Sequence, residues 1–264
     1  MPNRSIVFVH GLWIHSSAWE SWADFFRSNG YECHCPSWPG DSDSVSASRA
    51  NAKAIANRGV KEIADNYAKF ISTLPQAPVL IGHSFGGLLV QNLLGRSVAS
   101  AAIAIDPAPI KGVWQLPFSA LRSALPVLGN PFNLTKSVSL TFDQFRYSFG
   151  NAVSEQEARE MYDRNTIPAP GRPLFQAATA TFNPWSQTKV HTANATRGPL
   201  LLVSGEKDHI VPPVLTKATY RKYSKSAAVT ELKSFANRGH SLTMDHGWKE
   251  IAEYSLNWLQ QKGL

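Results

Sequence analysis

Cysteine is scarce in this sequence: among 264 residues there are only Cys33 and Cys35. Two cysteines this close along the chain do not easily reach the geometry of a disulfide with each other. A metal site would need further ligands at matching spacing, and the sequence offers none. We therefore expect reduced thiols in the core and no metal site.

Long apolar runs are missing as well. No uninterrupted apolar stretch approaches the ~20 residues of a membrane-spanning helix. The first residues, MPNRSIVFVHG, enter an apolar run at once and lack the charged start and long apolar stretch of a signal peptide. We therefore expect no membrane span, no signal peptide and a cytoplasmic location.

Charge is sparse, and it is not concentrated anywhere. Charged residues make up 17% of the chain, and the formal net charge is +7 with a pI near 9.5. The 26 lysines and arginines are scattered, with no basic run longer than two residues. This pattern disfavours a nucleic-acid partner and indicates solubility with a weak attraction for anionic ligands.

Short apolar runs alternate with amphipathic segments along the first hundred residues. Residues 5–10, 79–83 and 101–106 are predicted to be buried strands, and residues 60–74 and 85–97 to be helices. Hydrophobic residues make up 43% of the chain, which is enough for a sizeable core. The alternation predicts the α/β class: a mostly parallel sheet with helices on both faces.

The first helix carries a capping signal. Ser17 is followed three residues later by Glu20, which is the spacing of a capping box, and Gly30 lies beyond the expected end. We therefore predict that this helix is capped by Ser17.

The strand and helix alternation stops in the middle of the chain. From about Pro107 to Arg197 the sequence is rich in Phe, Trp, Pro and Asn, with helical stretches but no convincing buried strand. Beyond this segment a strand, a helix, a strand and a terminal helix follow. We expect a core made of residues 1–110 and 198–264, and a helical cap made of residues 111–197.

A serine between glycines lies where a predicted strand meets a predicted helix. Residues 82–86, GHSFG, match the pattern G-x-S-x-G, which in this context marks a nucleophile turn. Gly82 and Gly86 lack the β-carbons that would clash where strand and helix approach. The pattern predicts that Ser84 is a nucleophile. An ordinary turn with incidental glycines is the alternative, and the flanking strand and helix disfavour it.

A serine hydroxyl needs a general base, and the base needs an orienting acid. Among eight histidines, His240 lies in the loop between the last predicted strand and the last helix. Such loops gather at the carboxyl edge of a parallel sheet. Asp208 follows another strand and is the favoured acid, while Asp106, at the end of the strand before the expected cap, competes with it. The predicted triad is Ser84, Asp208 and His240.

The negative charge that develops during acyl transfer requires two N–H donors. The amide of Phe85, directly after the nucleophile, is one candidate. The loop after the first strand should supply the other, because Gly11 allows a tight turn that presents the amide of Leu12. The neighbouring amide of Trp13 is the alternative.

Five motifs make the sequence resemble the α/β-hydrolase superfamily over nearly its whole length: VFVHGLW, PSWPGDSDS, IGHSFGG, VSGEKDHIVP and RGHSLTMDHGW. The resemblance implies this fold, the triad at the three positions named, no cofactor, and a cap inserted after the strand ending at Asp106. The chain departs from many members in lacking two leading antiparallel strands, and in PGDSDS where P-G-H-G-x-S is common. Epoxide hydrolases and haloalkane dehalogenases of this fold have aspartate at the turn, so Ser84 argues against both.

The expected activity is hydrolysis of a small, apolar or aromatic carboxylic ester or lactone through an acyl-enzyme. The partner is then a small-molecule substrate, and the protein a monomer or homodimer. The expected substrate contacts are Trp13, His83, Trp114, Phe118, Phe142, Phe145, Phe149, Trp185 and Ile210. Any single cap aromatic can equally well pack the cap on its own helices. The same triad also allows C–C bond hydrolysis, acyl transfer or cofactor-free oxygenation, and a hydrolase-fold small-molecule receptor is a further alternative.

Overall fold

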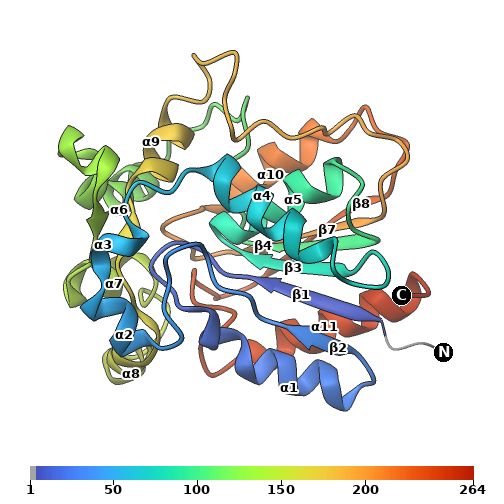
Figure 1. The fold of residues 1–264 in the computed structure, drawn as a ribbon, viewed down its shortest axis with the longest axis horizontal. Coiled ribbons are helices and arrows are strands. Elements are labelled where there is room, and N and C mark those ends of the chain that lie inside the picture. The colour runs from blue at the N-terminus through green and yellow to red at the C-terminus, as the bar shows by residue number, and fades with distance from the viewer. Residues whose placement is uncertain (1–3) are drawn as a thin grey trace.

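One parallel sheet forms the centre of the molecule in the computed structural model, which describes residues 4–264 (Figure 1). Its strands are β1 (Ser5–Val9), β2 (Glu32–His34), β3 (Val79–His83), β4 (Ala101–Ile105), β7 (Leu200–Gly205) and β8 (Thr230–Phe235). The order is β2-β1-β3-β4-β7-β8, and all neighbouring strands in it are parallel. The predicted α/β class with a mostly parallel sheet is confirmed. Parallel pairing brings the carboxyl ends of these strands to one edge of the sheet.

Helices cover both faces of the sheet (Figure 1). On one face lie α4 (Val60–Ile71), α5 (Phe85–Gly95) and α10 (Pro213–Lys222), and on the other α1 (Glu20–Ser28) and α11 (Trp248–Gln261). Because both faces are covered, the central strands are apolar at successive positions rather than at every second one. In β1, Val7 and Val9 belong to the first core cluster, and Ile6 and Phe8 to the second.

The start of the first helix differs from the sequence prediction. A short 3-10 helix, η1 (Ser16–Trp19), precedes α1, and its cap is His15. The amide of Ser17 donates to Nδ1 of His15 over 3.2 Å, and the Ser17 hydroxyl is bonded to the same nitrogen at 2.8 Å. The predicted Ser17 cap is therefore wrong, because the helical turn already begins at Ser16 and Ser17 lies inside it.

The chain between β4 and β7 is mainly helical. It contains α6 (Phe118–Leu128), η2 (Pro131–Thr135), α7 (Phe142–Ser148), α8 (Glu155–Asn165) and α9 (Arg172–Ala178). It also contains an antiparallel pair of two-residue strands, β5 (Ser137–Val138) and β6 (Ala169–Pro170). The buried β6 is a strand that the sequence analysis did not predict. The division into core and cap stays a prediction, and residues 1–3 of the expected core lie outside the described residues.

Two short helices after β2 lie beside this segment: α2 (Val45–Ala50) and α3 (Ala52–Ile55) (Figure 1). The guanidinium of Arg49, in α2, donates to the backbone carbonyls of Tyr162, Asp163 and Thr166. The first two lie in the last turn of α8, and Thr166 follows it directly. These bonds tie the β4–β7 segment to the chain that follows β2.

No helix within residues 4–264 combines the length and apolar character needed to cross a bilayer.

The two cysteines are free thiols at the second strand. Burial raises the pKa of Cys33 to about 12 and the pKa of Cys35 to about 11. Since the thiolate is the reactive form, both side chains are protonated and unreactive at neutral pH.

Candidate active site

Ser84 occupies the turn from β3 into α5, in a backbone conformation that is rare for a residue with a side chain. Its φ is 57° and its ψ is −121°, and the residue is buried. A β-carbon on Gly82 would overlap the carbonyl of Gly86, and one on Gly86 would overlap the carbonyl of Val9. The glycines are therefore required by the close approach of α5 to the ends of β3 and β1. This packing holds the strained serine at the carboxyl edge of the sheet.

His240 follows β8 and is fully buried. Its Nδ1 lies 2.6 Å from Oδ2 of Asp208, which follows β7. The carboxylate accepts this bond, so Nδ1 carries the proton of a neutral ring and Nε2 has a free lone pair. Among residues 4–264 no group hydrogen-bonds to Nε2. A neutral imidazole with one nitrogen held by a carboxylate and the other free can act as a general base.

Asp208 is held as a hydrogen-bond acceptor by the start of the following segment. Its Oδ1 accepts the amide of Ile210 at 2.6 Å and the amide of Val211 at 2.9 Å. With the bond from His240, the carboxyl group accepts three N–H donors, which fix its position beside the ring.

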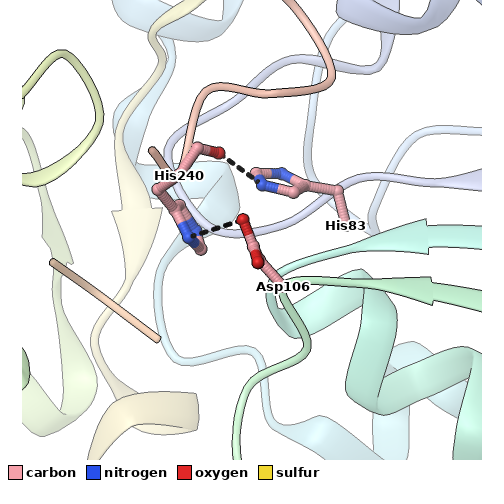
Figure 2. A group of neighbouring side chains, drawn as sticks. All are labelled: His83, Asp106 and His240. Carbon is pink, nitrogen blue, oxygen red and sulfur yellow. Dashed lines mark hydrogen bonds and ion pairs between the residues drawn. The ribbon is translucent and has the colours of Figure 1, made fainter. Parts of the chain in front are cut away.

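Asp106, the competing acid, lies at the end of β4 and is fully buried too (Figure 2). Its Oδ2 is 4.0 Å from Nδ1 of His240, which is too long for a hydrogen bond, while Asp208 is at 2.6 Å. Its Oδ1 instead accepts the amide of Gly205 at 2.7 Å. Burial raises the pKa of Asp106 well above its usual range, and the nearby Asp208 carboxylate adds to the rise. The ring of His240 is thus oriented by Asp208.

His83, the residue before Ser84, is bonded to the loop that carries the base. Its Nε2 lies 2.8 Å from the backbone carbonyl oxygen of His240 (Figure 2). A carbonyl only accepts, so this nitrogen carries the proton. Burial and the neighbouring His240 hold the pKa of His83 well below its usual range, so the ring is neutral.

Three buried groups lie close enough together to be considered as metal ligands: His83, Asp106 and His240 offer donor atoms within 4.8 Å of one another. Nε2 of His83 and Nδ1 of His240 each carry a proton that is already donated, to the His240 carbonyl and to Asp208. A metal at either nitrogen would displace one of these bonds. The hydrogen-bonded arrangement accounts for both rings without an ion.

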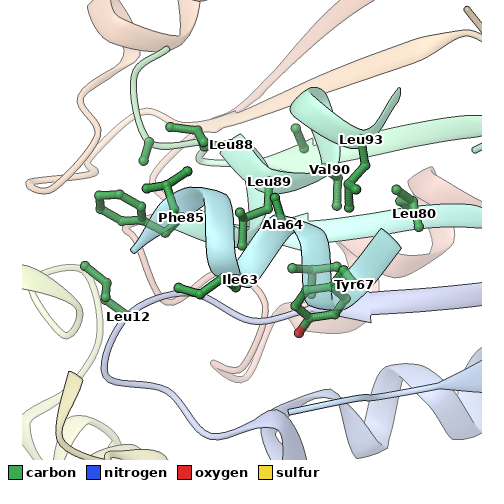
Figure 3. Close-up of a cluster of buried hydrophobic side chains, with 14 of the residues drawn as sticks. Leu12, Ile63, Ala64, Tyr67, Leu80, Phe85, Leu88, Leu89, Val90 and Leu93 are labelled. Atoms are coloured by element: carbon green, nitrogen blue, oxygen red, sulfur yellow. The ribbon is translucent and has the colours of Figure 1, made fainter. Parts of the chain in front are cut away.

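The loop after β1 lies directly against the Ser84 side chain. A β-carbon on Gly11 would come within 2.8 Å of the Ser84 Cβ and 3.3 Å of its Oγ. The amides of Leu12 and Trp13 follow, in a buried place, and within residues 4–264 neither donates to any acceptor. The side chains of Leu12 and Phe85 belong to the buried cluster drawn in Figure 3, which anchors this loop over the start of α5.

An apolar cavity of about 210 Å³ opens beside Ser84. Among the expected substrate contacts, Trp13, Trp114 and Ile210 line it, and Phe85 contributes as well. Its other walls include side chains of α6 and α9 that the sequence analysis missed: Leu121, Ala124, Leu174 and Ala177. The sequence shows the apolar spacing of these helices, but it does not indicate which helix face lies next to Ser84.

The other expected substrate contacts are not in the cavity wall. Phe145 and Phe149 are fully buried and stacked on each other, with centroids 5.0 Å apart, and Phe149 also meets the ring of His240 at 5.0 Å. Phe142 packs against Tyr162, His83 faces the His240 loop, and Phe118 and Trp185 are exposed. Some of these side chains therefore pack inside the protein, and the others lie on its surface.

A larger groove of about 630 Å³ lies elsewhere, lined by residues such as Ser17, Glu157 and His246. Its walls are mainly polar, and they include none of Ser84, Asp208 and His240. We place the candidate site at the smaller apolar cavity because its wall includes the strained Ser84.

Comparison with known proteins places this fold in a wider group. The model of the alpha/beta hydrolase family matches residues 6–254. A comparison with curated protein sequences gave no match. Solved structures with a similar fold include the monoacylglycerol lipase of Paleococcus ferrophilus, with 21% identity, a TM-score of 0.67, and 97% of this chain and 93% of that chain covered.

Two plant proteins have similar structures. A methylesterase from Arabidopsis is 17% identical with a TM-score of 0.68, and the match covers 97% of this chain and 99% of that chain. Tomato methylketone synthase I, complexed with 2-tridecanone, is 15% identical with a TM-score of 0.70, and 99% of each chain is covered. At these identities the likeness concerns the fold. Since the family model spans nearly the whole chain, the protein belongs to the alpha/beta hydrolase family of enzymes.

Proposed function

We propose that this protein is a serine hydrolase that cleaves a small, apolar or aromatic carboxylic ester or lactone. Ser84 is the nucleophile, His240 the general base and Asp208 the orienting acid. The observation that carries the proposal is the state of His240: its Nδ1 is bonded to Asp208 at 2.6 Å, and its buried Nε2 has no partner among the described residues. A base prepared in this way, at the same sheet edge as a strained serine, fits acyl transfer.

In the first half of the reaction, Nε2 of His240 takes the proton of Ser84 while Oγ forms a bond to the substrate carbonyl carbon. The electron pair of the C=O bond moves to its oxygen. When the carbonyl reforms, the bond to the leaving oxygen breaks, and His240 returns the proton to it. Asp208 stays ionised and stabilises the imidazolium.

In the second half, His240 takes a proton from water, and the hydroxide oxygen attacks the acyl carbon. Collapse of the second tetrahedral intermediate breaks the bond to Ser84, whose oxygen regains the proton. The amides of Phe85 and Leu12, with Trp13 as the alternative, are the proposed donors to the oxyanion. The lack of acceptors for the Leu12 and Trp13 amides supports this role, since a buried N–H without a partner is rare.

The cavity supports a small apolar acyl or alcohol group. Its volume is about 210 Å³, and its wall is formed largely by apolar side chains. Trp114 and Phe182 line it while remaining 64% and 85% exposed, and their rings meet edge to face 6.5 Å apart. We propose that residues 111–197 form a cap whose helices α6 and α9 close this cavity over Ser84. Two of the similar structures are named as a monoacylglycerol lipase and a methylesterase, which also favours an ester.

The test is turnover of p-nitrophenyl esters of varied acyl length, with lactones and diketones in parallel. Ser84→Ala should lower kcat/KM by about 10³-fold or more with folding intact. A matched control is Ser255→Ala, because Ser255 is a buried serine of α11 whose hydroxyl donates to the backbone carbonyl of Ile251 in its own helix. Wild-type turnover in Ser84→Ala would refute the proposal, and preference for diketones would favour C–C bond hydrolysis by the same triad.

A further inference from the structure

The carboxyl group of Asp106 is fully buried, and its two oxygens have different surroundings. Oδ1 accepts the amide of Gly205 at 2.7 Å. Oδ2 is buried, and no group within residues 4–264 hydrogen-bonds to it. The residue also has a φ of 41°, a strained value that the packing of β4 against β7 must hold in place. A strained, buried carboxyl group with one free oxygen requires an explanation.

The titratable neighbours of Asp106 leave no donor for Oδ2. His240 faces it from the loop after β8, but its Nδ1 proton is donated to Asp208. His83 faces it from β3, and its Nε2 proton is donated to the His240 carbonyl. Asp208, after β7, is an acidic neighbour, because its Oδ2 and Oδ2 of Asp106 lie 2.6 Å and 4.0 Å from the same Nδ1 of His240. Asp245 is the next acidic group.

Two ionised carboxylates cannot share such a buried place without strong repulsion, so one of them must hold a proton. The hydrogen bonds decide which one. Asp208 accepts three N–H donors, from Ile210, Val211 and His240, whereas Asp106 accepts one, from Gly205. The ionised group is therefore Asp208, and the proton belongs on the free oxygen of Asp106.

We propose that Asp106 is a positioning residue: its Oδ2 carries a proton at neutral pH, donates it in a hydrogen bond to the Asp208 carboxylate, and so holds Asp208 against His240. The role rests on the proposed function, in which Asp208 orients the base. Burial raises the pKa of Asp106 well above its usual range, with the Asp208 charge adding to the rise and the Gly205 amide opposing it. The neutral acid also draws charge from Asp208, which limits how strongly Asp208 stabilises the imidazolium.

The test compares Asp106→Asn, which keeps an N–H donor, with Asp106→Ala, which removes it. Asparagine should keep kcat within about threefold of wild type and leave the acid limb of the kcat/KM profile in place, because a neutral donor replaces a neutral donor. Alanine should lower kcat by about 10-fold to 100-fold, the range for losing a buried bond to a charged group, and move the acid limb to higher pH.

Two results in this comparison would overturn the proposal. If Asp106 were ionised, Asp106→Asn would remove a negative charge beside His240, and the acid limb would move to lower pH. If Asp106 only supported the fold, both variants would keep the kcat and pH profile of wild type whatever they did to the thermal stability.

Infrared spectroscopy gives a readout that needs neither turnover nor the alanine variant. At neutral pH the wild-type protein should show the C=O stretching band of a protonated carboxyl group, and Asp106→Asn should lack it. The comparison is repeated in the Ser84→Ala background. If the band is not lost in Asp106→Asn, the neutral Asp106 is refuted. If Ser84→Ala is active, the proposed hydrolase function is refuted, but the band of Asp106 is unaffected.

Discussion

The ring of His83 donates from Nε2 to the backbone carbonyl oxygen of His240 over 2.8 Å, and the two ring centroids lie 4.6 Å apart. The residue next to the proposed nucleophile thus holds the loop that carries the proposed base. The bond joins the end of β3 to the loop after β8, two segments 157 residues apart along the chain. It couples the position of His240 to the turn that presents Ser84.

This bond leads to a prediction for His83. His83→Phe keeps a ring but leaves the buried His240 carbonyl without its donor, so kcat should fall about 10-fold to 100-fold with little change in KM. His83→Gln, which can offer an N–H to the same carbonyl, should retain more activity. Separate measurement of kcat and KM checks this, and equal kcat values for wild type and His83→Phe would show that the bond is dispensable.

The two acid candidates should differ sharply in their effect on turnover. Asp208→Asn removes the acceptor that selects the Nδ1–H form of His240, so kcat should fall by about 10⁴-fold. Asp106→Asn should cost far less, since its Oδ2 is 4.0 Å from the same nitrogen. Steady-state kinetics of the two variants, with circular dichroism to confirm folding, decide the ranking. The opposite order would assign the acid to the end of β4.

The cavity wall predicts how acyl-chain preference can be changed. Ala177→Leu adds volume where α9 lines the cavity, so kcat/KM for long acyl chains should fall about tenfold or more relative to acetate. Trp185→Ala is the matched control, because Trp185 is 85% exposed and is not in the wall. A series of p-nitrophenyl esters measures both profiles. An unchanged profile in Ala177→Leu would place the acyl group elsewhere.

The raised pKa of Asp106 predicts how its replacement changes stability with pH. A carboxyl group whose pKa is higher in the folded than in the unfolded protein contributes stability below the unfolded pKa, and this stability is lost as pH rises toward the folded pKa. Asp106→Asn does not titrate, so its Tm relative to wild type should be higher at pH 8 than at pH 4. Thermal melts across this range test the sign. A Tm of Asp106→Asn relative to wild type that falls as pH rises would contradict it.

The sequence alone was enough to predict the fold class and the turn. Apolar residues at successive positions of β1 and β3 indicate strands covered on both faces, and the helical spacing of residues 60–74 indicates a helix on one of them. The glycines around Ser84 predict a close approach of strand and helix. The structure has this approach, because Gly86 packs so closely against the Val9 carbonyl that a β-carbon would overlap it. These features are local, because each depends on the backbone geometry of a few consecutive residues.

Only the tertiary structure decided between residues that are far apart in the sequence. Asp106 follows β4 and Asp208 follows β7, so both lie at the carboxyl edge of the sheet. The packing of the loop after β8 puts Nδ1 of His240 at 2.6 Å from Asp208 and 4.0 Å from Asp106. In the same way, composition marked the aromatic residues between β4 and β7, but helix packing buried Phe145, exposed Trp185 and left Trp114 in the cavity wall. Periodicity determines which face of an element is apolar, whereas the partner that this face meets depends on how all the elements pack together.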